Sequence, residues 1–238
     1  MSETASRLIR IGGLAPFSAT DYPGLFSAVL FVQGCPWRCG YCHNPHLQPR
    51  ATSHAIDWPE IMDLLQRRRG LIDAVVFSGG EPTIDPGLQL AMQDVRQLGF
   101  RIGLHTGGIY PERLAEVLPL IDWVGLDIKA PFYTYDTVTQ IKGSSQPALR
   151  SLEMILSYGI DLECRTTLHP SLLSPDDILR LAQSLADMEV ENYALQLFRK
   201  QGCNDDGLIQ ATMLDYPGKS LIDSVRSLFP RFSYREDA

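Results

Sequence analysis

Long apolar runs are missing from this 238-residue sequence. The N-terminal segment, "MSETASRLIRIGG", lacks the apolar core of a signal peptide, and no segment is long enough to cross a bilayer. Basic residues are also few, because 21 Lys and Arg stand against 28 Asp and Glu and give a net charge of -7. This balance argues against a nucleic acid or an anionic membrane as the main partner. We therefore expect a cytoplasmic protein that binds neither.

Cysteine is scarce and unevenly placed. The chain has five cysteines, three of them within residues 35–42 and none within residues 50–80. An odd number with three close together fits metal ligation better than a disulfide framework. A chain of this length buries enough surface to fold without disulfides, and cytoplasmic thiols stay reduced.

Apolar runs rich in β-branched residues alternate along the chain with amphipathic segments. This alternation predicts six β–α units, and hence a parallel sheet covered by helices, with two units fewer than a closed eight-stranded barrel. The expected strands lie within residues 25–34, 73–82, 101–108, 122–131, 161–170 and 193–200. The expected helices lie within residues 55–70, 87–99, 111–120, 146–159, 174–188 and 218–232. No shift in composition marks a boundary, so we expect one domain over residues 1–238, with a core at about 15–200 and a C-terminal helical extension over 201–238.

Unusual residues follow the expected strands at the ends where ligands bind in parallel α/β folds. The three cysteines come directly after the first strand, and "GGEP" comes after the second. "HTGG", "DIK" and "CRTT" end the next three. These segments should therefore meet around one site.

The spacing of Cys35, Cys39 and Cys42 is C-x3-C-x2-C. One reading is a structural zinc site, although such sites are usually closed by four ligands and no fourth ligand stands at a suitable spacing. The other reading is a [4Fe–4S] cluster held by three thiolates. One iron of that cluster would then be free to bind a small chelating molecule.

The loop "CPWRCGYCHNP" resembles the signature of the radical S-adenosylmethionine (radical SAM) enzymes, and "GGEP" looks like the second signature of that superfamily. Within the superfamily, "DYPGLFSAVLFVQGC", the "YCHNP" ending and "GLDIKAPF" resemble the glycyl-radical-enzyme activases, and most closely the anaerobic ribonucleoside-triphosphate reductase activating proteins. The likeness covers about residues 15–199. It implies a partial (β/α)6 barrel open on one side, with a [4Fe–4S] cluster and S-adenosylmethionine (SAM) as cofactors.

The resemblance also implies roles for individual residues. Glu81, after the two glycines, would face the methionine ammonium group. Lys129 would meet the substrate carboxylate, and Asp127 would meet either a ribose hydroxyl or Lys129 itself. The expected cluster ligands are Cys35, Cys39 and Cys42, and the expected cofactor contacts are Tyr41, Cys42, His43, Gly79, Gly80, Glu81, Thr106, Asp127, Lys129 and Arg165. His105 stands where some activases carry an acidic residue, and we interpret it, like His169, as a core or rim histidine. Nothing in the sequence marks Cys164 or Cys203 as a reactive thiol.

The implied reaction begins with reductive cleavage of SAM to a 5′-deoxyadenosyl radical, which then takes a hydrogen atom. We expect the hydrogen atom to come from a backbone glycine of a partner enzyme, anaerobic ribonucleotide reductase, with flavodoxin or ferredoxin as the electron donor. The absence of cysteines from residues 50–80 agrees with a single cluster. Two alternatives stay open at this point: a radical SAM enzyme that acts on a small molecule, as the 7-carboxy-7-deazaguanine synthases do, and a non-enzymatic zinc or iron–sulfur protein.

Overall fold

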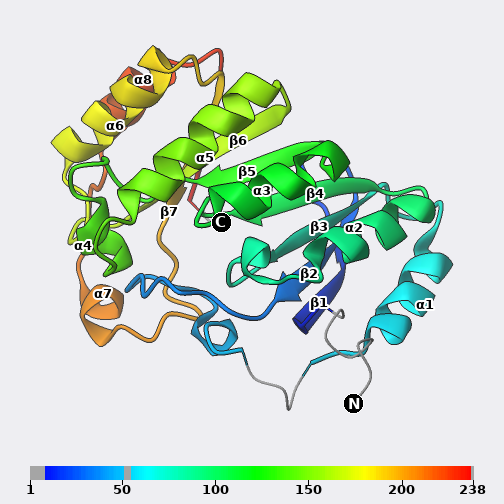
Figure 1. Cartoon of the computed structure of the whole chain (residues 1–238). Helices are drawn as coiled ribbons and strands as arrows, with labels where there is room; N and C mark the ends of the chain where they lie inside the picture. The colour runs from blue at the N-terminus through cyan, green and yellow to red at the C-terminus, as the bar shows by residue number, and fades with distance from the viewer. Residues whose placement is uncertain (1–8, 51–54, 237–238) are drawn as a thin grey trace.

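A single eight-stranded sheet organises the molecule (Figure 1). The computed structural model describes residues 9–50 and 55–236. The strands lie side by side in the order of the sequence, β1 antiparallel to β2 and all later neighbours parallel. Their bounds are β1 (Ile11–Ser18), β2 (Ser27–Val32), β3 (Ala74–Gly79), β4 (Arg101–Thr106), β5 (Trp123–Asp127), β6 (Asp161–Leu168), β7 (Asn192–Leu197) and β8 (Arg231–Arg235).

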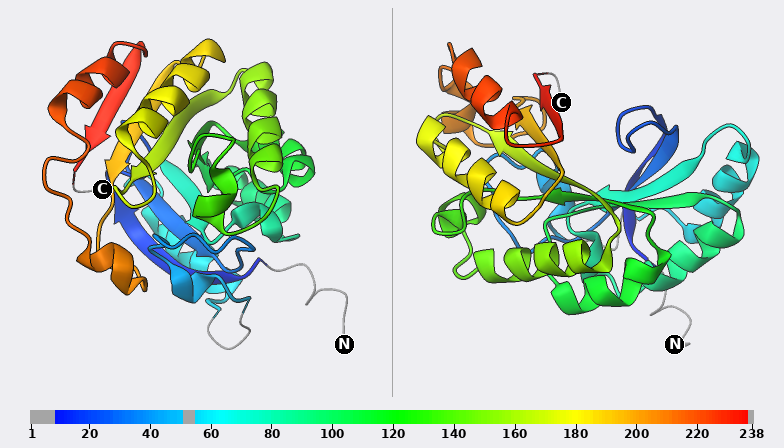
Figure 2. Two further views of the ribbon diagram at one scale, coloured as in Figure 1. Left: turned by 90° about the vertical axis from the view of Figure 1, so that its left-hand side faces the viewer. Right: turned by 90° about the horizontal axis from the view of Figure 1, so that it is seen from above.

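Helices cover the outer, convex face of the curved sheet (Figure 2). The eight α-helices among the described residues are α1 (Trp58–Arg68), α2 (Leu88–Gln97), α3 (Pro111–Val117), α4 (Tyr135–Thr139), α5 (Ser145–Tyr158), α6 (Pro175–Asp187), α7 (Asp206–Gln210) and α8 (Lys219–Arg226). Helix α6 shows why they form where they do. Ser174 and Asp177 make a capping box at its start, and its buried residues Ile178, Leu181 and Leu185 recur at helical spacing toward the sheet.

The sheet is an open, partial barrel, as predicted, because β1 and β8 are its two edge strands and do not pair with each other. A large core fills the space between the sheet and the helices. A second, smaller apolar cluster comprises Tyr22, Val29, Ala74, Val76 and Trp123. None of the helices formed by the described residues is long and apolar enough to cross a membrane.

Two strands lie outside the six predicted β–α units. Strand β1 reads "IGGLAPFS", and its glycines and proline are residues that strands generally disfavour, although an edge strand tolerates proline. Strand β8 lies in the C-terminal segment that we expected to be helical over residues 201–238. That segment contains α7 and α8, but the expected helix over 218–232 ends at Arg226, and the chain returns to the sheet as β8. The expectation of a purely helical extension is therefore wrong.

Candidate active site

A cavity of about 970 Å³ opens at the carboxyl ends of the parallel strands. Every cluster-binding and cofactor-binding residue predicted from the sequence lines this cavity. The expectation that the segments after successive strands meet around one site is therefore confirmed. The particular role of each residue stays a prediction.

The three cysteines follow β2 on a loop that faces the cavity, and each is partly buried. Burial, with a smaller contribution from the Glu81 carboxylate, raises the pKa of the Cys35 thiol to about 12. Burial also raises the pKa of Cys39. Without a bound metal these thiols are therefore protonated. A bound cation would favour the loss of their protons, so that they become thiolate ligands. Among the described residues, no three His, Cys, Asp or Glu side chains are grouped so as to hold a single metal ion.

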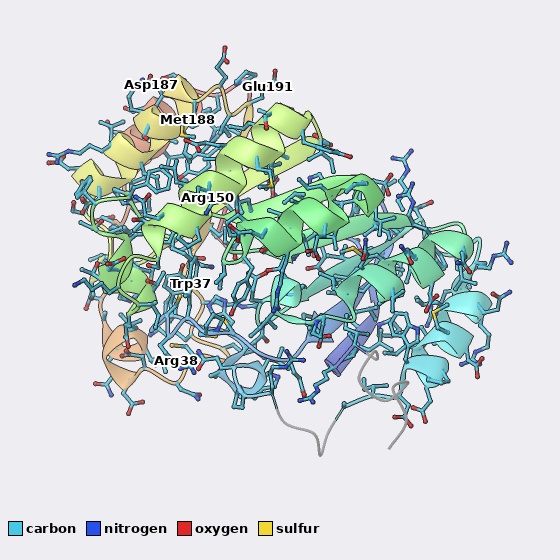
Figure 3. All side chains as sticks on the ribbon, viewed as in Figure 1. Trp37, Arg38, Arg150, Asp187, Met188 and Glu191 are labelled. Atoms are coloured by element: carbon cyan, nitrogen blue, oxygen red, sulfur yellow. The ribbon has the colours of Figure 1, made fainter. Side chains whose placement is uncertain are left out.

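The cysteine loop is held by backbone contacts from two distant segments. On one side, the Arg38 amide donates to the Thr139 carbonyl of α4 (2.9 Å). On the other side, a Cβ atom at Gly202 would overlap the His43 carbonyl, so the two backbones touch. The Cys203 thiol lies 3.4 Å from the carbonyl oxygen of Gly40, within reach of a hydrogen bond. Figure 1 shows α4 and α7 close to this loop, and Figure 3 labels Arg38 beside α7.

His43, directly after the third cysteine, is fixed by the same distant segment. Its Nε2 lies 3.1 Å from the carbonyl oxygen of Arg199, and its ring stacks on Phe198 with the centroids 5.8 Å apart. Burial, together with the nearby Arg199 charge, lowers the pKa of His43 to about 4. His43 is therefore a neutral side chain at the cavity wall at pH 7.

The two glycines of "GGEP" are required by the chain's own backbone. A Cβ atom at Gly79 would overlap the backbone of Val32, and one at Gly80 would overlap the carbonyl of Gly34. The Gly79 residue also has a φ of 115°, which disfavours any side chain. Both glycines line the cavity, but the atoms closest to the added Cβ positions belong to the end of β2 for Gly79 and to the start of the cysteine loop for Gly80. They bring the "GGEP" turn and the cysteine loop together.

The Glu81 carboxylate is buried and accepts hydrogen bonds at both oxygens. Its Oε1 accepts from the Thr83 amide (3.1 Å) and from the hydroxyls of Thr83 (2.5 Å) and Thr106 (2.7 Å). Its Oε2 accepts from the Gly107 amide (2.9 Å). Burial raises the pKa of Glu81, and these hydrogen bonds oppose that shift. No cationic side chain of the described residues forms an ion pair with Glu81.

Asp127 bridges two cations on the next wall of the cavity. Its Oδ2 lies 2.9 Å from Lys129 Nζ, and its Oδ1 lies 3.0 Å from Arg165 Nε. Burial acts to raise the pKa of Asp127, but the two cations outweigh it and hold that pKa below its usual range. The three side chains together carry one excess positive charge. Lys129 Nζ also lies 5.7 Å from the centre of the Tyr41 ring.

The two histidines that we interpreted as core or rim residues, His105 and His169, lie at the cavity rim and in the core. His105 Nε2 lies 2.8 Å from the carbonyl oxygen of Asp21, and its Nδ1 lies 3.3 Å from the Ser78 hydroxyl. Burial, with the Arg165 charge, lowers its pKa to about 3, so the ring is neutral at the cavity rim. His169 is fully buried, with Nε2 3.1 Å from the Leu208 carbonyl.

The family model of the radical SAM superfamily matches residues 29–182, which is more than half of the chain. The chain belongs to the radical SAM superfamily. It is therefore a radical SAM enzyme, and the non-enzymatic alternative is set aside. Enzymes of this superfamily use a [4Fe–4S] cluster and SAM, and the matched segment contains the cysteine loop, "GGEP" and the Asp127 cluster.

Similar proteins include activating enzymes. The chain is 28% identical to a protein of Methanocaldococcus jannaschii that is provisionally named a glycyl-radical enzyme activating enzyme, over 82% of each chain. It is also 28% identical to the pyruvate formate-lyase-activating enzyme of Clostridium pasteurianum, over 82% of this chain and 84% of that one. Among solved structures, Escherichia coli QueE shares the fold with a TM-score of 0.58 at 16% identity, over 98% of both chains.

Streptococcus suis SuiB, whose structure was solved with SAM and with its precursor peptide, also shares the fold. Its TM-score is 0.67 at 13% identity, and this chain spans about half the length of SuiB, 48%.

The donor set fits the radical SAM cluster. Three soft sulfur atoms on one loop face a cavity large enough for an inorganic cluster and a nucleotide-sized ligand. The buried, protonated thiols would be ionised by the cluster's own charge. Cys35, Cys39 and Cys42 would hold the cluster.

Other residues line the same cavity but were not predicted from the sequence. They include Asp21 and Pro23 on the β1–β2 connection, Trp37 on the cysteine loop, and Thr167, Gln196 and Arg235 on β6, β7 and β8. Arg235 lies on a strand that the sequence pattern did not reveal. Only the rule that alternate residues of a strand share a face could have found Thr167, two residues after Arg165.

Proposed function

We propose that this radical SAM enzyme activates a glycyl-radical enzyme, and that its partner is the anaerobic ribonucleoside-triphosphate reductase. Two observations support it: the cavity described above, and the similarity of the chain to proteins that are named activating enzymes. It includes the cluster ligands Cys35, Cys39 and Cys42 and the SAM contacts predicted from the sequence. When bound, the reduced cluster and SAM supply a 5′-deoxyadenosyl radical, the species that abstracts hydrogen.

The charges around the cavity carry the proposal for SAM. The methionine part of SAM bears an ammonium group and a carboxylate. The buried Glu81 carboxylate has no cationic partner among the described residues, so an ammonium group of the ligand can supply one. Lys129 and Arg165 exceed Asp127 by one positive charge, which a carboxylate of the ligand can offset. The two halves of the site therefore match a zwitterion held against the cysteine loop.

The residues of the chain contribute position and shielding. Thr106 links the second signature to β4, because its hydroxyl donates to Glu81 and accepts from the Gly108 amide (2.9 Å). Asp127 fixes the directions of Lys129 and Arg165, so these cations are already ordered before a ligand arrives. A cofactor bound among them would leave the part of the cavity near β8 open for a substrate.

A polypeptide can reach that open part because the sheet does not close. The edge strands β1 and β8 are unpaired with each other, and residues next to both line the cavity. A partner enzyme would present its glycine on a loop that enters between these edges. Cavity-lining residues such as Phe31 and Ile109 would then limit the access of water to the radical.

The test is the formation of a glycine-centred radical. The anaerobically reconstituted protein is mixed with purified anaerobic ribonucleotide reductase, SAM and a reductant, flavodoxin or dithionite, and the reductase is followed by electron paramagnetic resonance. We expect a glycyl radical with the wild-type protein and none with the Cys39→Ala variant, which should also lose iron–sulfur absorbance. Turnover of a pterin without any glycyl radical would instead support the alternative of a small-molecule enzyme, and would refute the proposal.

A further inference from the structure

The cavity has a polar wall that the proposed SAM contacts do not use. Thr167 on β6 is the registered partner of Gln196 on β7, and Gln196 is the registered partner of Arg235 on β8. Registered residues of neighbouring strands point to the same face of a sheet, and all three of these line the cavity. They form a row across three adjacent strands, which we call the β6–β8 row.

The β6–β8 row begins next to the proposed SAM groups and extends away from them, since Thr167 lies two residues after Arg165 on β6. The other proposed SAM groups lie at or just after the ends of β2, β3, β4 and β5, whereas the row continues over β7 to the open edge at β8. On the side of the early strands, the connection between β1 and β2 contributes Asp21 and Pro23, and the Asp21 carbonyl lies 2.8 Å from His105 Nε2 of β4. A segment that enters beside β8 meets the row before it reaches the cysteine loop.

The row offers hydrogen bonds without net charge. Within residues 9–50 and 55–236, the side chains of Thr167 and Gln196 make no hydrogen bond, and both are half-buried. Arg235 Nη2 donates to Glu163 Oε2 at 2.7 Å, and the Glu163 side chain is only 5% exposed. That carboxylate offsets the charge of the guanidinium and holds it in place. The other four N–H donors of Arg235 have no partner among the described residues.

A neutral row of donors and acceptors matches an uncharged, hydrogen-bonding ligand better than a phosphate or a carboxylate. The backbone of an extended peptide is such a ligand, because it presents alternating N–H and C=O groups. Gln196 and Thr167 can each both donate and accept, and Arg235 can donate to a carbonyl. Neighbouring strands are about 4.8 Å apart, so the row spans about 10 Å, or roughly three residues of extended chain.

We propose that Thr167, Gln196 and Arg235 bind the backbone of the partner's glycine loop and align it in the cavity. This inference rests on the proposed function, and it names the surface that receives the loop. It assigns these three side chains to the partner and not to SAM.

The experiment measures the reductase concentration that gives half-maximal glycyl radical. Gln196→Ala leaves no buried charge behind and should raise that concentration about 3- to 10-fold, as expected for one lost hydrogen bond to a neutral group. The affinity of this variant for SAM, measured by equilibrium dialysis, should stay within about twofold of wild type. A larger change would mean that Gln196 makes a hydrogen bond to SAM, because even a weak neutral hydrogen bond changes affinity about twofold. The double variant Glu163→Gln, Arg235→Gln keeps the pair neutral and should show the same pattern.

The control is Arg231→Gln, on the same strand but exposed and outside the cavity, which should behave as wild type. The inference is overturned if both test variants keep the wild-type half-saturation, or if their SAM affinity falls in parallel, since the row would then belong to the SAM site. If the wild-type protein itself forms no glycyl radical, the proposed function fails, and the assignment of the row falls with it.

Discussion

Replacement of Glu81 by glutamine tests the electrostatic reasoning about the site. The substitution Glu81→Gln keeps the size of the side chain and can keep the hydrogen bonds from Thr83 and Thr106 to one oxygen. It replaces the oxygen that accepts from the Gly107 amide with an amide nitrogen, and it removes the only negative charge that the proposal assigns to the SAM ammonium group.

The substitution should weaken SAM binding more than it weakens the fold. A hydrogen bond to a charged group contributes about 1.5–3 kcal/mol, so loss of the ammonium–carboxylate contact should weaken SAM binding about 10- to 150-fold. The fold should not weaken to the same degree. A buried carboxylate without a cationic partner is costly to keep ionised, and glutamine avoids that cost.

The direction in which the free energy of unfolding changes with pH tests the same reasoning independently of SAM binding. Burial raises the pKa of Glu81, so the folded state binds this proton more tightly than the unfolded chain does. The free energy of unfolding of the ligand-free wild type therefore falls as pH rises from the ordinary pKa of a glutamate through the raised one. Glu81→Gln lacks this decrease. Between these two pKa values, the free energy of unfolding of the variant without SAM should therefore stay constant while that of the wild type falls.

The assay pairs equilibrium dialysis of SAM with thermal unfolding, both on anaerobically reconstituted protein over a range of pH. The wild type should lose SAM affinity as acid protonates Glu81, whereas the variant should bind weakly at every pH. The exposed Glu116→Gln serves as the matched control. Wild-type SAM affinity in the Glu81→Gln variant, with an unchanged pH profile, would refute the assignment of Glu81 to the ammonium group.

Two further predictions concern the second charged group and the support of the cysteine loop. Lys129→Met removes a cation from Asp127 and abolishes the excess positive charge, so SAM affinity should fall at least about 10-fold by equilibrium dialysis; unchanged affinity would contradict the proposed carboxylate contact. Gly202→Ala introduces a Cβ atom against the His43 carbonyl at a φ of 86°, and it should lower the free energy of unfolding by about 1–3 kcal/mol and reduce the iron bound after reconstitution. Gly13→Ala, where the added Cβ atom would meet only ordinary van der Waals contacts of 3.5 Å and beyond, is its control, and equal behaviour of the two variants would argue against the contact.

The six β–α units could be predicted because their strands are continuous apolar runs and their helices are amphipathic. The strand over Ala74–Gly79 and the helix over Pro175–Asp187 both fall inside the predicted ranges. Strands β1 and β8 were missed for physical reasons. β1 contains residues that weaken strands. β8 is a short alternation of polar and aromatic residues, "RFSYR", that directly follows an amphipathic helix, and the expected helix over 218–232 included its first two residues.

The candidate site was predictable to a similar extent. Motif spacing placed the cysteines, "GGEP" and Lys129 at strand ends, and the cavity brings them together. Contacts between particular side chains were harder to predict from the sequence. For Asp127 the sequence left a ribose hydroxyl and Lys129 open as partners. The structure shows the contact with Lys129 and adds one with Arg165, 38 residues further along the chain. Likewise, periodicity could not show that the glycines of "GGEP" touch the chain itself.

The support of the cysteine loop has a consequence for the biosynthesis of the protein. Cys203 contacts Gly40 from a position 163 residues later. At about 5–20 residues per second, a ribosome needs roughly 8–30 s to add that stretch, so the thiols leave the exit tunnel well before their supporting segment exists. The cluster can therefore enter a correctly shaped loop only after the chain has been synthesised past Cys203. Until then, protection of the nascent thiols from oxygen must come from the surroundings of the chain.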